Sequence, residues 1–203
     1  VKIPTPTERG DDMKKILVTL LFGMFLFGNT QVIAQELPYE RKQAVDSLAL
    51  EKVRDLSKYI KIIGSKDTPW SEANRVIERA EELFAPDAEI GVSSLVTNEV
   101  LYYKVRQYLE RLSRLNYDRV EIDWYNIEYV SELQRQPDGT YVGVITVFQT
   151  FKGFDKEGRL IYQDETKKDI TVYVKRKETQ IGGRLIGFWD VMLGDMRVKE
   201  TTL

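Results

Sequence analysis

The sequence predicts an α+β fold in which three N-terminal helices pack against an antiparallel sheet. The first observation is the C-terminal part, from Asp118 to Glu200, which contains four long stretches typical of strands. The second is the residues between these stretches, which favour tight turns. The third is the preceding part, where apolar residues recur at helical spacing. The expected strands are residues 119–132, 140–153, 160–175 and 184–199.

Turn-forming residues separate the four expected strands. Segments 136–139, 155–158 and 180–183 each end in glycine, and the first two also contain Asp. Gly and Asp accept the backbone conformations of tight turns, so successive strands should pair as hairpins. The sequence therefore predicts a four-stranded antiparallel meander.

Three helices and one short strand are expected before the meander. Pro38 can open the first helix and Gly64 can end it. Thr68 is the expected N-cap of the second helix, with Pro69 as its first residue. The third helix is expected from about Asn98 to Leu115, because Leu101, Val105, Tyr108, Leu112 and Leu115 are spaced four, three, four and three residues apart. The short strand is expected at residues 88–92.

Composition excludes several classes of function. The 203 residues contain 30 Lys and Arg against 32 Asp and Glu, so the basic excess typical of nucleic-acid binders is missing. Cysteine and histidine are absent, which excludes disulfides, Ser-His and Cys-His catalysis, and metal sites built on those ligands. No calcium-loop spacing is found either, so we expect no metal and no cofactor.

The N-terminus has the features of an export signal. Met13-Lys14-Lys15 is followed by an apolar run at residues 16–27, and Ala34 is a small residue at the expected cut. The run is too short to span a bilayer, so no membrane span is expected after processing. We interpret residues 1–12 as an upstream over-extension, 13–34 as a signal peptide and 35–203 as a single domain. The alternative is a buried core helix. The expected location is periplasmic or secreted.

The order helix, helix, short strand, helix and meander resembles the nuclear transport factor 2-like superfamily, which includes SnoaL-like and ketosteroid-isomerase-like proteins. Residues 82–90, where the second helix runs directly into a strand, and the helix at 103–115 carry the resemblance. It covers almost all of residues 40–200 and suggests an exported bacterial member. The resemblance implies a cone-shaped fold with a strongly curved antiparallel sheet around the helices and a pocket at the wide end. Some members are enzymes; many bind ligands or assemble without catalysis, often as dimers.

Asp190 and Asp123 are the candidate catalytic residues. Each lies in the middle of an expected strand beside a tryptophan, where an apolar setting would raise the carboxyl pKa toward that of a general base or acid. In the isomerase branch of the superfamily an acidic residue and a tyrosine perform this chemistry. The alternative is that both carboxylates are solvated or satisfied by neighbouring arginines.

Strand alternation leaves a second largely apolar face on the sheet, beyond the face that the helices can cover. Apolar patches of this kind usually mark interfaces, so we expect a homodimer or an envelope protein partner here. The alternative is that the curved sheet folds over its own first helix or N-terminal segment, and that the two tryptophans belong to the core. The candidate residues of a ligand pocket or interface are Trp189, Phe188, Met192, Trp124, Tyr125 and Tyr173.

Three functions follow from these observations. The leading hypothesis is an exported, non-catalytic and dimeric cell-envelope module that binds a partner protein or a small ligand. The alternative is a small pocket enzyme of the isomerase, dehydratase or cyclase type with Asp190 or Asp123 as base; it requires one of those carboxylates in a pocket, near a tyrosine hydroxyl. The third is a structural assembly subunit without a ligand pocket.

Overall fold

The computed structural model describes residues 37–94 and 99–202. The expected signal peptide at 13–34 and the over-extension at 1–12 lie outside this part. The described helices are α2 (Tyr39–Gly64), α3 (Trp70–Glu81) and α4 (Val105–Ser113). The strands are β1 (Glu89–Ser94), β2 (Glu99–Lys104), β3 (Arg119–Arg135), β4 (Tyr141–Phe154), β5 (Leu160–Ile181) and β6 (Arg184–Thr202).

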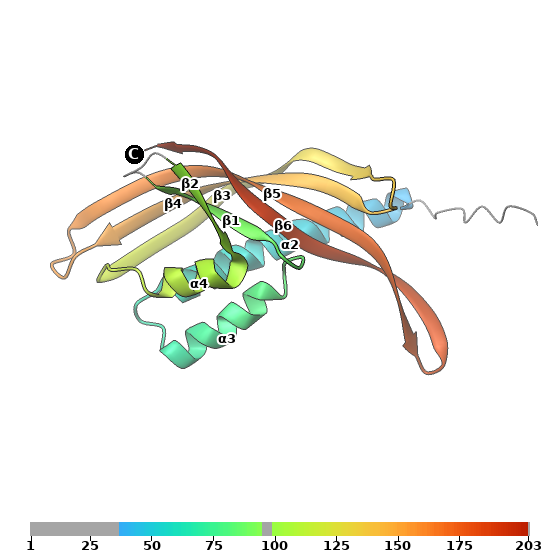
Figure 1. Ribbon diagram of the computed structural model, residues 1–203, viewed down its shortest axis with the longest axis horizontal. Helices are drawn as coiled ribbons and strands as arrows, with labels where there is room; N and C mark the ends of the chain where they lie inside the picture. The colour runs from blue at the N-terminus through green and yellow to red at the C-terminus, as the bar shows by residue number, and fades with distance from the viewer. Residues whose placement is uncertain (1–36, 95–98, 203) are drawn as a thin grey trace, which may run out of the picture. The chain divides into compact units, whose positions relative to one another are not determined.

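The six strands form one sheet in the order β2-β1-β6-β5-β4-β3. Figure 1 shows the sheet curving over the three helices, which all lie on its concave side. The α+β class with helices on a curved sheet is therefore confirmed. The sheet is mixed rather than wholly antiparallel, because β1 pairs with β6 in the parallel direction. The four long strands pair as the predicted hairpins.

The core lies between α2 and the concave face of the sheet. Val53, Leu56 and Ile60 follow one stripe of α2 and are completely buried. Ile170 and Leu193 face them from alternate positions of β5 and β6 and are also completely buried. Apolar side chains spaced at 3.6 residues on the helix thus pack against apolar side chains at every second residue of the strands, in a single layer.

The predicted third helix is wrong in its first part. Residues 99–104 form β2, whose register with β1 runs from the pair Glu89–Lys104 to the pair Ser94–Glu99. Val100, Tyr102 and Tyr103 are residue types that fit strands, and hydrogen bonding to β1 outweighs their helical spacing. Only Val105–Ser113 is helical.

The predicted N-cap of the second helix is also wrong. The Thr68 hydroxyl donates to the backbone oxygen of Ile62 at 2.7 Å, at the end of α2. Pro69 instead precedes the first residue of α3, Trp70, and no side chain caps that helix. The hydroxyl thus satisfies one of the last carbonyl groups of α2, which have no partner within the helix.

The parallel contact between β1 and β6 is short but well anchored. Its register contains one residue pair, Ile90 with Met196. The chain just before β1 adds two main-chain hydrogen bonds: the Ala85 amide donates to the Leu193 oxygen at 2.6 Å, and the Leu193 amide donates to the Leu83 oxygen at 2.8 Å. These bonds fix the end of α3 against β6.

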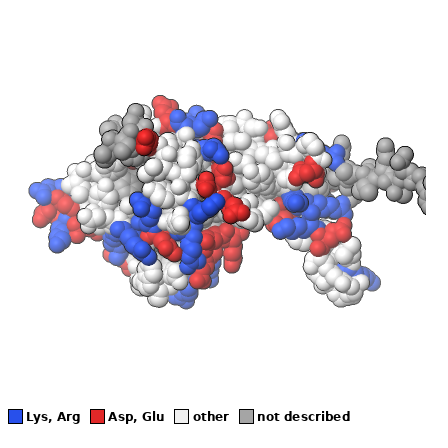
Figure 2. Space-filling view, in the orientation of Figure 1, with Lys and Arg blue, Asp and Glu red and all other residues white. Residues whose placement is uncertain are grey.

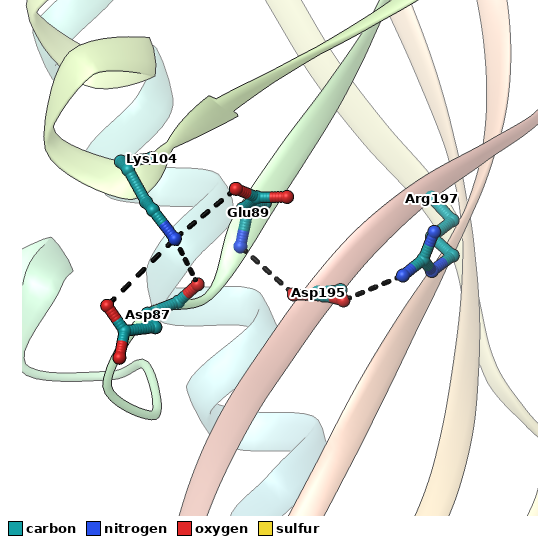
Figure 3. Close-up of polar contacts among 5 residues, drawn as sticks. All are labelled: Asp87, Glu89, Lys104, Asp195 and Arg197. Carbon is teal, nitrogen blue, oxygen red and sulfur yellow. Dashed lines mark hydrogen bonds and ion pairs between the residues drawn. The ribbon is translucent and has the colours of Figure 1, made fainter.

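Charged side chains reinforce the same junction (Figure 3). The Glu89 amide donates to Asp195 at 3.0 Å, and Arg197 lies 2.9 Å from the other oxygen of that carboxylate. Lys104 forms an ion pair with Glu89 at 3.2 Å and donates to the Asp87 backbone oxygen at 3.0 Å. The pairing positions β1 and β2 beside α4.

The β5–β6 hairpin extends beyond the rest of the sheet. β4 ends its pairing with β5 at Tyr141 and Val174, whereas β5 and β6 continue to Ile181 and Arg184. Residues 175–190 therefore form a two-stranded arm, which Figure 1 shows projecting past β4. Figure 2 shows the tip of the arm largely without charged side chains. Its exposed apolar residues are Ile181, Leu185, Ile186 and Phe188.

Acidic and basic side chains are interspersed over the face drawn in Figure 2. Several pairs are close, such as Arg106 with Glu81 at 2.8 Å and with Glu110 at 3.0 Å. Exposed pairs of this kind contribute little to stability. Among the described helices, none has the length and hydropathy needed to cross a membrane.

Candidate active site

A cavity of about 250 Å³ opens on the concave side of the sheet, next to α4. Residues of β1, β2, α4, β3, β4 and β5 line it. The lining residues are Val92, Ser93, Tyr103, Tyr108, Arg111, Leu112, Leu115, Tyr117, Ile122, Gln149, Phe151, Tyr162, Asp164, Thr166 and Lys168. The cavity thus combines an aromatic and aliphatic wall with a few polar groups, as ligand sites commonly do.

Strand β5 supplies the chemistry. Tyr162, Asp164, Thr166 and Lys168 occupy alternate positions, so their side chains share the concave face. The same face continues into the core with Ile170. One strand face is therefore polar where it lines the cavity and apolar where it meets α2.

Asp164 and Tyr162 form the most closely coupled pair in the cavity. The Tyr162 hydroxyl donates to Asp164 Oδ2 at 2.5 Å. Asp164 Oδ1 is buried and has no hydrogen-bond partner within the described residues. Burial raises the pKa of the Asp164 carboxyl, against the opposing effects of the Tyr162 hydrogen bond and the charge of Lys168. Burial, and then the Asp164 carboxylate, raise the pKa of Tyr162.

Lys168 lies deeper along the same face, with 3% of its surface exposed. Its Nζ donates to Gln149 Oε1 at 3.3 Å and lies 5.8 Å from the centre of the Tyr108 ring. Gln149 Oε1 also accepts a hydrogen bond from the Trp124 indole at 3.2 Å, which fixes the amide. Burial lowers the pKa of Lys168 to about 8, although Asp164 opposes the change.

Aromatic residues form the rest of the wall. Burial, and then the charge of Asp164, raise the pKa of Tyr108 and of Tyr117. The Tyr117 ring covers the backbone of Gly153, where a Cβ atom would lie 2.4 Å from it. Arg111 stacks over the Tyr103 ring at 4.6 Å. These phenols stay protonated at neutral pH and can donate hydrogen bonds to a ligand.

The two predicted catalytic residues do not line the cavity. Asp123 pairs with Lys61 at 2.8 Å, and 64% of its side chain is exposed. Asp190 pairs with Lys177 at 2.5 Å on the β5–β6 arm. Each carboxylate thus has a lysine partner, and neither is among the side chains around the cavity. Their roles as catalytic residues stay untested predictions.

The predicted aromatic candidates are dispersed along the sheet. Trp124 donates its indole N–H to Gln149 but is not among the residues that line the cavity. Trp189 packs against the core, with its ring 5.7 Å from that of Tyr141 in an edge-to-face arrangement. Phe188 is exposed on the arm.

The other three candidates lie away from the cavity as well. Tyr125 stacks on Phe148 at 5.6 Å. Tyr173 and Met192 line a second, shallower hollow beside the turn between β3 and β4, together with Val142. The structure does not bring the six predicted pocket or interface residues together in one site.

The sequence reasoning missed Asp164, Lys168 and Gln149 as site residues. A signal for the first two exists: a polar run with period two precedes an apolar run of the same period and phase on β5. Such a run indicates polar side chains on a face that must be covered. Gln149 has no comparable signal, because Val147 and Phe151, its neighbours on the same face of β4, are apolar.

No protein-family model matches the sequence, and no curated protein matches it significantly. Solved structures similar to the chain include a candidate scytalone dehydratase from Novosphingobium aromaticivorans, with 16% identity and a TM-score of 0.42 over 79% of this chain and 89% of that one. A type 2 hexachlorocyclohexane dehydrochlorinase has 14% identity and a TM-score of 0.39, over 80% of this chain and 91% of that one. Aln2 from a Streptomyces species has 12% identity and a TM-score of 0.37, over 78% of this chain and 94% of that one. Similarities of this size do not bear on the reaction.

The described part of the chain has the arrangement that the nuclear transport factor 2-like resemblance implies. Helices cover the concave face of a curved sheet, and a cavity opens between α4 and the long strands.

Proposed function

We propose that the chain is a small pocket enzyme that moves a proton at a carbon atom next to a carbonyl group, with Asp164 as the base. One observation carries the proposal. Asp164 has one oxygen held by Tyr162 and a second, buried oxygen without a partner in the described residues, on the wall of the cavity. An unpartnered buried carboxylate oxygen is costly for folding, which favours a role for it in binding or catalysis.

The surroundings of Asp164 support proton transfer. A general base works best when its pKa lies near the working pH, and burial raises the pKa of this carboxyl in that direction. The Tyr162 hydroxyl occupies one oxygen, so the other is oriented for a substrate proton. The pair therefore has the acidic residue and the tyrosine that the isomerase and dehydratase alternative requires, on residues other than Asp123 and Asp190.

Two donors deeper in the cavity support the developing negative charge. Removing a proton next to a carbonyl places charge on the carbonyl oxygen, and donors fixed in a dry site stabilise it strongly. Lys168 and the Tyr108 hydroxyl are such donors. The volume of about 250 Å³ equals roughly eight water molecules. The substrate is then a carbonyl compound with on the order of ten non-hydrogen atoms.

The proposal is tested by solvent deuterium exchange. Small ketones and aldehydes are incubated with the protein in D₂O, and NMR follows deuterium at the carbon next to the carbonyl. Asp164→Asn should slow exchange at least about 100-fold, the usual contribution of a general base. Tyr162→Phe should slow it less, because the carboxylate remains.

A matched control lies on the same strand. Asp169 projects to the other face of β5, where it accepts a hydrogen bond from Thr146 at 2.6 Å. Asp169→Asn should leave exchange unchanged. Equal exchange rates in Asp164→Asn and Asp169→Asn would refute a catalytic role for Asp164.

A binding or assembly role is the second candidate function. The exposed apolar residues of the β5–β6 arm and the convex face of the sheet favour it, since such patches usually mark interfaces. The homodimer, the envelope partner and the periplasmic or secreted location belong to this proposal. Light scattering on the chain from residue 35, beside the double variant Leu185→Ser and Phe188→Ser, measures whether the arm holds a dimer. A monomer in both samples would count against it.

A further inference from the structure

We propose that Lys168 is a covalent catalyst whose amine attacks the carbonyl carbon of the substrate and forms an imine. The inference rests on the proposed function and names the chemical step and the substrate class, an aldehyde or ketone. It gives Lys168 the role of nucleophile instead of a fixed positive charge.

The contacts of Lys168 set it apart from the lysines on the surface. Lys61 and Lys177 each pair with a carboxylate. Lys168 has no carboxylate within ion-pair distance in the described residues, although it is almost completely buried. A buried lysine without an ion pair is rare, because the charged form loses its hydration without compensation. The neutral amine, which is the nucleophilic form, is favoured at such a position.

The amine is also accessible to a ligand. Its one hydrogen-bond acceptor in the described part of the chain, Gln149, and its aromatic neighbour, Tyr108, both line the cavity, as Lys168 itself does. The hydrogen bond of 3.3 Å leaves two of its N–H donors without partners there. The Nζ atom therefore lies on the wall of the space that a small carbonyl compound would occupy.

The acid–base behaviour supports the same assignment. With a pKa of about 8, roughly one Lys168 in ten is neutral at pH 7. A solvated lysine with a pKa near 10.4 is neutral in roughly one molecule in 2,500 at that pH. Desolvation of this kind is how nucleophilic lysines are generally activated.

Asp164 balances the protons of the reaction. Its carboxylate takes one proton from the Lys168 ammonium through an intervening water, because the two groups lie beyond ion-pair distance. The nitrogen lone pair then forms a bond to the carbonyl carbon while the C=O π pair moves to oxygen. A second N–H proton neutralises that oxygen and gives a carbinolamine. Asp164 returns its proton to the hydroxyl, the C–O bond breaks, and water leaves. Ammonium and carbonyl compound thus yield one protonated imine and one water, with no oxidant or other reactant.

The protonated imine strengthens the proposed proton transfer. Its positive nitrogen draws electrons from the neighbouring carbon more strongly than a carbonyl oxygen does. Asp164, again a carboxylate after the water has left, can then remove the proton from that carbon. The electron pair of the broken C–H bond forms a C=C bond to the imine carbon, and the C=N π pair moves onto nitrogen. The product is a neutral enamine, so one carboxylate serves both steps.

Reductive trapping in the full-length protein tests the inference. The probe is acetaldehyde with sodium cyanoborohydride at pH 7, which converts an imine into a stable N-ethyl amine. Mass spectrometry of peptides measures labelling at Lys168 and at Lys58, an exposed lysine of α2 that pairs with Asp55. Lys168 should be labelled at least tenfold faster than Lys58, with a rate that levels off above about pH 8. Labelling of Lys168 no faster than Lys58 would overturn the inference.

Deuterium exchange separates this inference from the proposed function. Lys168→Arg keeps a positive charge and removes the nucleophile, so it should abolish both trapping and exchange. Exchange that persists in Lys168→Arg contradicts the imine and leaves the proposed function intact. Trapping at Lys168 without exchange in the wild-type protein supports the imine and contradicts the proton transfer. The comparison of Lys168 with Lys58 within the wild-type protein needs no variant to fold.

Discussion

Replacing Lys168 with methionine should make the protein more stable at neutral pH. Lys168 is 3% exposed, and its ammonium makes one hydrogen bond, to Gln149, in the described residues. Methionine keeps the length of the apolar stem and removes the buried charge. The Gln149 oxygen keeps the hydrogen bond from the Trp124 indole, so the substitution leaves it with a partner.

The magnitude follows from the pKa of Lys168. A decrease from 10.5 to about 8 corresponds to about 3 kcal/mol of destabilisation at pH 7, at roughly 1.4 kcal/mol per pKa unit. The pKa of about 8 already includes the attraction to Asp164, so the lost hydrogen bond to Gln149 is what offsets this destabilisation, by about 1–2 kcal/mol. The net gain at pH 7 should be about 1–2 kcal/mol.

The pH dependence has a definite sign. The folded pKa lies below the unfolded one, so the unfolded chain binds more protons between about pH 8 and 10.5, and the wild-type protein recovers stability as pH rises through that window. Its penalty decreases from about 3 kcal/mol at pH 7 to about 1 kcal/mol at pH 9.5. The advantage of Lys168→Met should therefore shrink by about 2 kcal/mol over that range.

Urea denaturation at pH 7 and pH 9.5 measures this difference directly. Lys58→Met, which removes an exposed lysine, serves as the control and should show no such loss of advantage at high pH. A Lys168→Met variant that is less stable than the wild type at pH 7, with a difference independent of pH, would refute the reasoning that desolvation dominates at Lys168.

Three further predictions concern stability and activity. Asp123→Asn and Asp190→Asn each remove a lysine-paired carboxylate outside the cavity. The free energy of unfolding, measured with urea, should therefore change by less than about 0.5 kcal/mol, and deuterium exchange should persist. A 100-fold loss of exchange in either variant would restore that residue as a catalytic candidate. Gly153→Ala should cost about 1–3 kcal/mol, because the new Cβ would lie 2.4 Å from the Tyr117 ring, and Tyr117→Ala should relieve that cost in the double variant. Leu193→Ala should cost about 2–5 kcal/mol in the same assay, because Leu193 is completely buried; a loss below about 1 kcal/mol would contradict its place in the core.

The long strands were predictable because local signals and tertiary structure agree there. Gly139 and Gly158 have φ values of +82° and +78°, which glycine accepts without strain, and hairpins form at both turns. The end of the first helix at Gly64 was predictable for a similar reason, since the apolar period stops there. The largest difference in bounds among the long strands is in β5, which was expected to end at residue 175 and continues to Ile181 in the arm.

The third helix failed because two local signals conflict. Leu101, Val105 and Tyr108 have helical spacing, yet the first of them lies in β2 and is exposed, while the other two are buried in α4. The hydrogen bonds to β1 decide the outcome for residues 99–104. β1 takes its place beside β6 through contacts distant in sequence, and no local window contains that information.

Asp123 and Asp190 were predicted as catalytic residues because each is adjacent to a tryptophan, but adjacency in a strand does not place two side chains in the same environment. Adjacent residues of a strand project to opposite faces. Trp124 and Trp189 pack against the core, so Asp123 and Asp190 beside them must face outward. Asp164 lies two residues from Tyr162 and therefore shares its face. The partners that close the cavity come from α4, β1 and β4, and only the folded chain brings them to β5.

The exposed tip of the arm at residues 175–190 and the cavity residues lie at distant positions of the same strand, β5. The turn of the arm, at Gly182 and Gly183, lies about 14 residues from Lys168 on β5, or roughly 45 Å along an extended strand. A peptide tag or fluorescent reporter inserted between these glycines would therefore sit far from the cavity. Such an insertion would disturb any contact made through the tip of the arm and leave the lining of the cavity unchanged.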